Sequence, residues 1–242
     1  MGDITPEGLR ALAAIAETYA AEVRSAISQN LLLRFVPEEA LGGLYEALLE
    51  AGLALPEAHT LLDITRCPGA DTCNLAITRS RGLAQALEAH LSALPLAQDP
   101  GAKAIGVKIS GCPNSCGQHH IADIGFYGSS RKVGEREVPH YVLLLGGRTR
   151  EGEARFGQVV GRIPARRVPE AVERILKRYL EERQNGESFQ AYLDRVGAAS
   201  FKPLLQDLQE VPPYEEAPEF YQDLGAEGEA FSVQLGRGEC AV

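Results

Sequence analysis

Long hydrophobic runs are missing from this 242-residue sequence, so no segment of it is predicted to cross a membrane. The sequence also lacks the pattern of an N-terminal signal peptide, and it contains no internal repeat and no low-complexity run. These absences argue against an integral membrane protein and against a repeat protein. Hydrophobic residues still make up 45% of the chain, which is enough to bury a core in one large domain or two small ones.

Cysteine is scarce as well, and its placement is informative. Four of the five cysteines form two short pairs: Cys67 and Cys73 are spaced C-x5-C, and Cys112 and Cys116 are spaced C-x3-C. A proline follows the first cysteine of each pair, with glycine or asparagine nearby, so the backbone can bend and bring its N–H groups close to a bound inorganic centre. Two such pairs of thiolates are typical of a site for a soft metal centre.

Several kinds of site use cysteines in this way. Disulfides need an oxidising compartment, which is not expected without a signal peptide. A structural zinc ion prefers pairs with about two to four residues between the cysteines, so the C-x5-C pair is wide for it. Buried inert cysteines explain single residues but not two pairs flanked by proline and glycine. A [4Fe–4S] cluster, which takes four thiolates, is the best fit, and this thiol-rich site predicts a cytoplasmic protein.

The residues around the cysteines predict the elements that carry them. Leucines at three- and four-residue steps predict an amphipathic helix over about 73–94, capped by Asp71 or Thr72, with its positive end at the anionic cluster. An apolar strand at about 103–110 precedes the second pair, and a tight connection leads to another strand at about 121–127. Further strands are predicted at about 140–146 and 157–163, and further helices at about 168–184, 187–196 and 200–209.

The two ends of the chain differ from this central part. Before residue 56 we predict a small α+β sandwich, with helices from Pro6 to about Val23 and over 37–53 and a strand within 25–36. Residues 210–242 carry eight acids and one base, which accounts for −7 of the net charge of −9. This proline-containing segment is predicted to be an extended, mostly surface tail that aids solubility and packs in part through its apolar residues. The predicted domains are therefore 1–56, 57–209 and 210–242.

Longer motifs around the cysteines resemble the sirohaem and [4Fe–4S] nitrite and sulfite reductase family. The strongest is the C-x5-C pair followed by G-C-P-N-S-C-G-Q at 111–118 and A-D-I-G-F at 122–126. The likeness extends over roughly residues 2–200 and concerns the cysteine-bearing half of the family. Further matching segments are L-G-G at 145–147, R-I-P at 162–164, G-E-S-F at 186–189 with Arg195, G-D-I-T-P at 2–6, and the segment 23–30.

The resemblance implies an α+β fold and a set of site residues. A small ferredoxin-like α/β sandwich domain would precede a mixed-sheet domain, flanked by helices, that binds sirohaem and the [4Fe–4S] cluster. The four paired cysteines would hold the cluster, and Cys116 would be the catalytic thiolate that bridges it to the haem iron. The expected cofactor-binding residues are Asn114, Arg24, Gln29, Asn30, Gln118, Arg66 and Arg148, and Lys108 is a further candidate because sirohaem carries many carboxylates.

The function implied by the resemblance is that of an oxidoreductase. It would reduce sulfite to sulfide, or nitrite to ammonia, with six electrons passing through the cluster to the haem iron. The expected partners are the anion, an acidic electron donor such as ferredoxin, and either a second copy of the chain or a complementary half subunit, with no nucleic acid and no membrane. The alternatives are a non-catalytic iron–sulfur subunit of a two-half reductase and a cobalamin-biosynthesis relative of the family.

Other side chains have both a functional and a plain structural interpretation. His119 and His120 follow Gln118 and would deliver protons beside a haem, although packing at the start of a strand is the favoured interpretation. Two basic sets have the charge to dock an acidic donor, but such residues are more often simply exposed. These sets are Arg131, Lys132 and Arg136, and Arg162, Arg166 and Arg167. Cys240 is interpreted as an ordinary cysteine of the tail.

Overall fold

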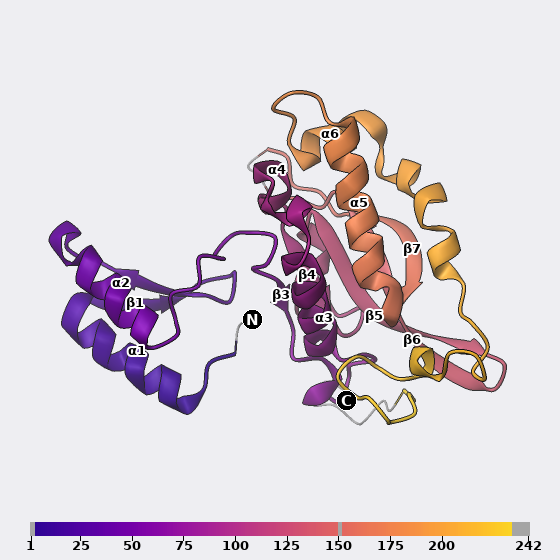
Figure 1. Ribbon diagram of the computed structural model, residues 1–242, viewed down its shortest axis with the longest axis horizontal. Helices are drawn as coiled ribbons and strands as arrows, with labels where there is room; N and C mark the ends of the chain where they lie inside the picture. Colours follow the sequence, from indigo (N-terminus) through magenta and orange to yellow (C-terminus); the bar gives the residue numbers. More distant parts are fainter. Residues whose placement is uncertain (1–2, 150–151, 234–242) are drawn as a thin grey trace. The chain divides into compact units, whose positions relative to one another are not determined.

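The structure is a computed structural model that describes residues 3–149 and 152–233 (Figure 1). The chain divides into two units, Met1–His59 and Thr60–Val242. In the described residues, no helix combines the length and the apolar composition needed to cross a bilayer.

The first unit consists of two helices and a two-stranded antiparallel ribbon. Helix α1 (Pro6–Tyr19) has Thr5 as its N-cap, and the Thr5 Oγ1 accepts a hydrogen bond from the Gly8 N–H at 3.1 Å. Strands β1 (Glu22–Ser25) and β2 (Leu31–Arg34) form the ribbon, and α2 (Leu41–Glu50) follows. The first helix is therefore shorter than predicted, because Val23 and its neighbours pair with β2 instead of continuing the helix. Among described residues 3–59, only Leu12, Ala16 and Leu44 are buried.

The second unit is built on a five-stranded mixed sheet, as predicted. Its strands lie in chain order, and Figure 1 shows them side by side. They are β3 (Thr65–Arg66), β4 (Val107–Ser110), β5 (Ile124–Val133), β6 (Arg136–Leu145) and β7 (Gln158–Pro164). The first three strands are parallel to one another, and the β5–β6 and β6–β7 pairs are antiparallel.

One face of this sheet is covered by α3 (Ser80–Ser92) and α5 (Val168–Glu182), which Figure 1 shows lying against it. Leucines of α3 and aliphatic residues of α5 are fully buried in one core together with strand residues such as Ile109. The short helix α4 (Pro100–Lys103) precedes β4, and α6 (Phe189–Val196) follows α5. The helix predicted over 200–209 is instead a series of short 3₁₀ turns.

The helix predicted to begin at Cys73 begins only at Ser80, so that prediction and its caps at Asp71 or Thr72 were wrong. The reason lies in the backbone of the preceding segment. The N–H groups of Ile77 and Thr78 both donate to the Gly111 carbonyl oxygen, at 2.8 and 3.0 Å. They are therefore not available to the carbonyl groups of Cys73 and Asn74, as a helix beginning at Cys73 would require. Cys73 therefore does not lie at the positive end of α3.

The acidic C-terminal segment is more than a solvated tail. Residues 211–233 pack onto the second unit, where Ala217, Tyr221 and Leu224 are buried. Cys240, which was interpreted as an ordinary cysteine of the tail, lies outside the described residues.

Candidate cofactor site

The two cysteine pairs meet because β3 and β4 are parallel neighbours. Carboxyl ends of parallel strands lie at the same edge of a sheet. Cys67 directly follows β3, and Cys112 lies two residues after the end of β4. The Cys67 N–H donates to the Ile109 carbonyl oxygen at 3.1 Å, which continues the pairing of the two strands into the first cysteine. The strand order thus places both loops at one end of the sheet.

The first loop is tightly packed against the start of α3. Gly69 has a φ of +65°, and a Cβ placed there would lie 2.5 Å from the Ser80 backbone nitrogen, so only glycine fits. The Ser80 hydroxyl donates to the Cys67 carbonyl oxygen at 2.6 Å and lies 3.5 Å from the Cys67 sulfur. Ser80 is fully buried, so its hydroxyl fixes the loop from inside the protein.

Gly111 connects the two loops. Its N–H donates to the Cys67 Sγ at 3.1 Å, and its carbonyl oxygen accepts the two N–H groups of the first loop described above. An N–H donor at a thiolate stabilises the negative charge that a metal-bound sulfur carries. The backbone of one loop therefore supports the sulfur of the other.

The second loop turns sharply after Cys112. Ser115 and Gln118 both have φ values near +60°, and the Gly117 N–H donates to the Ser110 hydroxyl at 3.1 Å. Pro113, Asn114 and Cys116 are exposed at the tip of this turn. The turn therefore keeps Cys116 accessible while Cys112 stays buried.

The four thiols form one electrostatic group. All four are free, Cys67 and Cys112 being buried and Cys73 partly buried. Burial raises the pKa of Cys112, the Asn114 N–H opposes that rise, and the charges of the other three thiolates raise it further. As thiolates, the four sulfurs would repel one another, and backbone N–H groups are directed at two of them, Cys67 and Cys112. A cationic centre bound between the thiolates would offset that repulsion. These residues therefore fit an iron–sulfur cluster.

A single metal ion and a cluster need different arrangements of thiolates. In the described residues, no three or more His, Cys, Asp or Glu side chains are grouped so as to hold one ion. Thiolates around a single zinc each lie about 2.3 Å from the metal, whereas a four-iron cluster is ligated at its corners.

A polar row accompanies the second loop. The Lys108 ammonium donates to the Gln118 side-chain oxygen at 3.2 Å and to the Thr65 hydroxyl at 3.4 Å. Burial lowers the pKa of Lys108, and the negative charge of Asp63 opposes that change. Lys108 and Gln118 are therefore held together near the cysteines, and Arg66, which is also buried, directly precedes Cys67.

His119 is fully buried beneath the second loop. Its Nδ1 lies 2.8 Å from the Ser110 hydroxyl, and its ring packs against Tyr127 with centroids 4.9 Å apart. Burial lowers its pKa to about 4, with a further contribution from His120. At neutral pH the ring is uncharged, and its contacts are those of a packed core histidine.

Three further predicted cofactor residues belong to the other unit of the chain. Arg24, Gln29 and Asn30 belong to the first unit, where Arg24 contacts Glu22 and Asn30 donates to Ser28. They stay predictions.

Arg148 follows the carboxyl end of β6, which pairs with the start of β5. The cysteine loops follow the carboxyl end of the parallel strand β4, so Arg148 lies at the opposite end of the sheet. It forms an ion pair with Asp194 at 2.9 Å. This placement does not favour the predicted contact between Arg148 and a cofactor at the cysteines.

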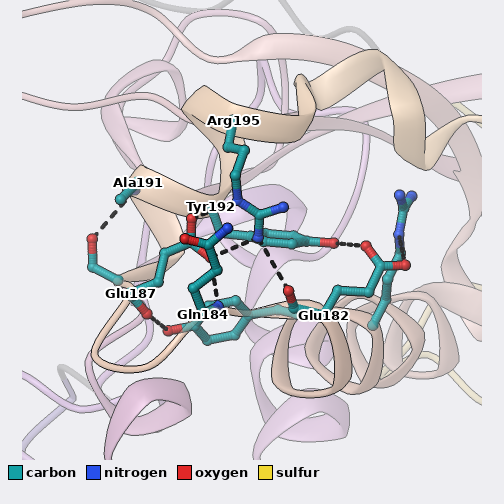
Figure 2. Close-up of polar contacts among 9 residues, drawn as sticks. Glu182, Gln184, Glu187, Ala191, Tyr192 and Arg195 are labelled. Atoms are coloured by element: carbon teal, nitrogen blue, oxygen red, sulfur yellow. Dashed lines mark hydrogen bonds and ion pairs between the residues drawn. The ribbon is translucent and has the colours of Figure 1, made fainter.

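The G-E-S-F segment with Arg195 acts as a structural clamp between α5 and α6 (Figure 2). The Arg195 guanidinium donates to both oxygens of the Glu187 carboxylate, at 2.8 and 2.7 Å, and to the Glu182 carbonyl at 3.1 Å. The Gln184 N–H also donates to Glu187. These contacts lower the pKa of Glu187 to about 2, first through Arg195 and then through Gln184.

Three residues near the site were not predicted from the sequence. Ser80 and Thr78 lie in the segment predicted as helix, and their side chains contact Cys67 and Gly111 instead. Asp223 of the C-terminal segment is buried and accepts the Arg79 N–H at 2.7 Å. Its only signal was an acid between the apolar residues Tyr221 and Leu224. Burial raises the pKa of Asp223 to about 6, and the N–H groups of Arg79 and Leu224 oppose the rise.

Comparison with known families gives two matches along the chain. Residues 57–211 match the family described as "Nitrite and sulphite reductase 4Fe-4S domain". Residues 1–51 match the "Nitrite/Sulfite reductase ferredoxin-like half domain". The first match alone covers more than half of the chain and contains all four paired cysteines.

Curated relatives carry reductase names. The chain is 33% identical over 153 residues to a ferredoxin–nitrite reductase of Synechococcus elongatus, covering 61% of this chain and 28% of the relative. It is 28% identical over 196 residues to the sulfite reductase [NADPH] hemoprotein beta-component of Methylobacterium nodulans, covering 79% and 31%. The chain thus spans about a third of the length of the curated relatives it matches.

Solved structures agree on the fold. The NirA protein of Mycobacterium tuberculosis superposes with a TM-score of 0.66 at 26% identity, covering 78% of this chain and 35% of that one. Dissimilatory sulfite reductase I (DsrI) superposes with a TM-score of 0.60 at 16% identity, covering 87% and 67%, which concerns the fold alone. The predicted α+β fold is confirmed, and the expected cofactors, a [4Fe–4S] cluster and sirohaem, are those of the matched family.

Proposed function

This chain belongs to the nitrite and sulphite reductase family, and we propose that it takes part in the six-electron reduction of sulfite to sulfide, with nitrite to ammonia as the other candidate reaction. The observation that supports this most is the convergence of four free thiols from two loops at one end of the sheet. Relatives named for nitrite reduction and for sulfite reduction both match this chain, and activity assays on the two anions decide between them.

The chain's own residues divide the work around the cofactors. When bound, the cluster and sirohaem supply electron storage and a haem iron. Cys67, Cys73 and Cys112 would hold the cluster, with N–H groups of Gly111 and Asn114 stabilising the charge on two of the sulfurs. Cys116 is the exposed thiol of the set, so we assign to it the bridging role towards the haem iron.

The surroundings of the loops suit an anionic tetrapyrrole. Lys108 and Arg66 place two basic side chains beside the loops, and Gln118 and Asn114 add amide groups. We propose Asn114, Gln118 and Arg66 as cofactor neighbours, with Arg24, Gln29 and Asn30 as candidates from the first unit.

Partners are proposed from charge and from the family. The β5–β6 hairpin tip exposes Arg131, Lys132 and Arg136, which have the charge to dock an acidic electron donor. A second copy of the chain or a complementary half subunit is the other proposed partner. With a complementary half subunit, the second candidate function is an iron–sulfur electron-transfer subunit whose partner carries out the reduction.

The two candidate functions differ in their spectra. Protein reconstituted with both cofactors should show a strong Soret band, a long-wavelength haem band and one iron beyond those of the cluster. Broad cluster absorbance alone would favour the electron-transfer subunit. Activity with a reduced ferredoxin, assayed on sulfite and on nitrite, then identifies the substrate.

Replacement of the bridging thiol tests the assignment of Cys116. We expect Cys116→Ser to remove the electronic coupling between the cluster and the haem, seen by electron paramagnetic resonance, together with turnover of both anions. Cys240→Ser is the matched control, because Cys240 lies outside the two pairs, and it should behave as the unaltered protein. Full turnover in Cys116→Ser contradicts the bridging role.

A further inference from the structure

The C-terminal segment 217–233, called the strap here, lies beyond the residues that match the reductase family, which end at 211. Figure 1 shows this yellow segment returning to the end of α3 where that helix begins. Asp223 is only 4% exposed and Leu224 only 7% exposed, although the segment around them is strongly acidic. A segment outside the family match that nonetheless buries a carboxylate requires a specific partner for it.

The buried carboxylate of Asp223 is bound to the segment that carries the first cysteine pair. Its Oδ2 accepts the Arg79 N–H at 2.7 Å, directly before α3 starts, and its Oδ1 accepts the Leu224 N–H at 2.9 Å. Arg79 is the residue before Ser80, whose hydroxyl fixes the Cys67 carbonyl. The strap therefore supplies the hydrogen-bond acceptor at this helix start that the first loop does not supply itself.

The Arg79 guanidinium joins the strap to the cysteine loop a second time. It donates to the Gly225 carbonyl oxygen at 3.0 Å and lies 3.4 Å from the Glu229 carboxylate. On its other side, it lies 3.6 Å from the Asp71 carboxylate, between Cys67 and Cys73. One side chain thus connects the loop with two points of the strap.

Helix α3 has a glycine where the strap lies against it. A Cβ at Gly82 would lie 1.9 Å from the Leu224 carbonyl oxygen, so any other residue would displace the strap. Glycine weakens a helix relative to alanine. The close approach of the strap explains why a glycine occupies position 82 inside α3.

The strap also forms a wall beside Cys73. A hollow of about 320 Å³ separates the two, lined by Cys73, Asn74 and Ile77 on one side and by Asp223 and Phe231 on the other. The far end of the strap is held where the Val233 N–H donates to the Glu137 carboxylate of β6 at 2.8 Å. The strap is therefore fixed at both ends across the side of the loop that carries Cys73.

We propose that the strap is a positioning element for the cluster site, and that Asp223 and Arg79 are its positioning residues. They hold the segment from Cys67 to Ser80 in the conformation that presents Cys67 and Cys73 to the cluster. The role at the cluster rests on the proposed function, whereas the ordering of the loop by the strap does not.

Hydrogen exchange on the protein as purified tests the ordering directly. We expect Asp223→Ala to raise the exchange rates of amides in residues 67–82 at least tenfold, with amides of β5 and β6 unchanged. Glu216→Ala is the matched control, because it removes an exposed carboxylate from the same acidic segment. Unchanged exchange in 67–82, or an equal rise throughout the sheet, overturns the proposal.

Loss of the cluster is the second readout. In reconstituted protein, an iron chelator should bleach the cluster absorbance severalfold faster in Asp223→Ala than in Glu216→Ala. Equal bleaching combined with faster local exchange would retain the ordering role and remove the role at the cluster. If neither variant takes up a cluster, the proposed function fails while the exchange result still decides the ordering.

Gly82→Ala provides an independent variant that changes no charge. It should increase exchange in 67–82 and speed bleaching, although alanine is the better helix former. Gly42→Ala in α2 is its control, since a Cβ there meets no atom within 4 Å. If Gly82→Ala leaves both readouts at the level of Gly42→Ala, the strap does not position the loop.

Discussion

Single buried side chains set the charge state around the cysteine loops. Ser110 accepts the Gly117 N–H and contacts His119, so one hydroxyl connects the end of β4 with both sides of the second loop. His119 remains neutral because its ring is buried. Protonation would place a buried positive charge beneath the loop. Acid is therefore expected to lower the stability of this part of the molecule.

Acid stability should report the state of His119. Its pKa is lowered from 6.5 to about 4 in the folded protein, so the unfolded chain takes up a proton first as the pH falls. Neutral His119 makes its full contribution to the free energy of unfolding above pH 6.5. This contribution is lost as the pH falls through about 4, and the total loss is up to about 3 kcal/mol. Denaturant unfolding at several pH values measures this decline.

The variant His119→Phe separates this titration from other acid effects. Phenylalanine keeps an aromatic ring against Tyr127 but cannot be protonated. The decline between pH 6.5 and 4 should become shallower in the variant, while the two proteins keep parallel profiles above pH 7. An unchanged acid decline would show that another group causes it.

Whole elements at the site are positioned by close backbone contacts. A Cβ at Gly128 in β5 would lie 2.1 Å from the Thr78 Oγ1 and 2.3 Å from the Gly111 carbonyl oxygen. The strand therefore presses directly against the contact between the two cysteine loops.

We expect Gly128→Ala to separate the strand from the loops. Overpacking of this kind costs about 1–3 kcal/mol, and here it should also lower the amount of cluster taken up in reconstitution. Thermal unfolding and iron content per chain measure the two effects. Ser130→Ala on the same strand is the control, and equal cluster uptake in both variants would contradict the importance of this contact.

The connection between α5 and α6 depends on the pair of Glu187 and Arg195. The folded pKa of Glu187 is lowered from 4.5 to about 2, so its stabilising contribution is present above pH 4.5 and is lost as the pH falls through 2. Glu187→Gln should lower the melting temperature at neutral pH and reduce its fall between pH 4.5 and 2. Glu181→Gln, an exposed acid on α5, should leave the melting temperature nearly unchanged.

At the scale of the molecule, the first unit has too little core to be self-sufficient. Within described residues 3–59 its three buried residues all lie on the two helices, and none lies on the two-stranded ribbon. Isolated two-stranded sheets are only marginally stable. Large apolar residues of the ribbon and its turns remain exposed, among them Ile27, Leu32 and Phe35. An exposed apolar surface beside unpaired strand edges favours assembly with further protein.

This surface predicts that the chain associates in solution. Sedimentation at micromolar concentration should show a species larger than the monomer, and Leu32→Glu should shift it towards the monomer by charging the ribbon. Ala14→Glu on α1 introduces the same charge at an exposed helix position and should leave the assembly intact. A species that is monomeric at all concentrations tested would contradict the predicted association.

The sequence by itself determined the chemistry of the cysteines and most elements of the second unit. Cysteine spacing, flanking prolines and leucine periodicity are local patterns, and they predicted the metal centre, several strands and the helix over 168–184, found at Val168–Glu182. The mixed sheet was implied by the resemblance to the family. Local patterns also predicted that the C-terminal segment packs in part, without revealing where. Such patterns act within a few residues of one another, which is why they can be interpreted without a fold.

Only the tertiary structure decided the start of α3, the placement of Arg148 and the role of Asp223. Gly111 takes the N–H groups of Ile77 and Thr78, and Asp223 takes that of Arg79 from 144 residues away. Backbone donors choose between local and distant acceptors by their positions in space, which leucine spacing does not record. Parallel pairing of β3 and β4 places the Gly111 acceptor beside the first loop, and the packed C-terminal segment places Asp223 beside Arg79.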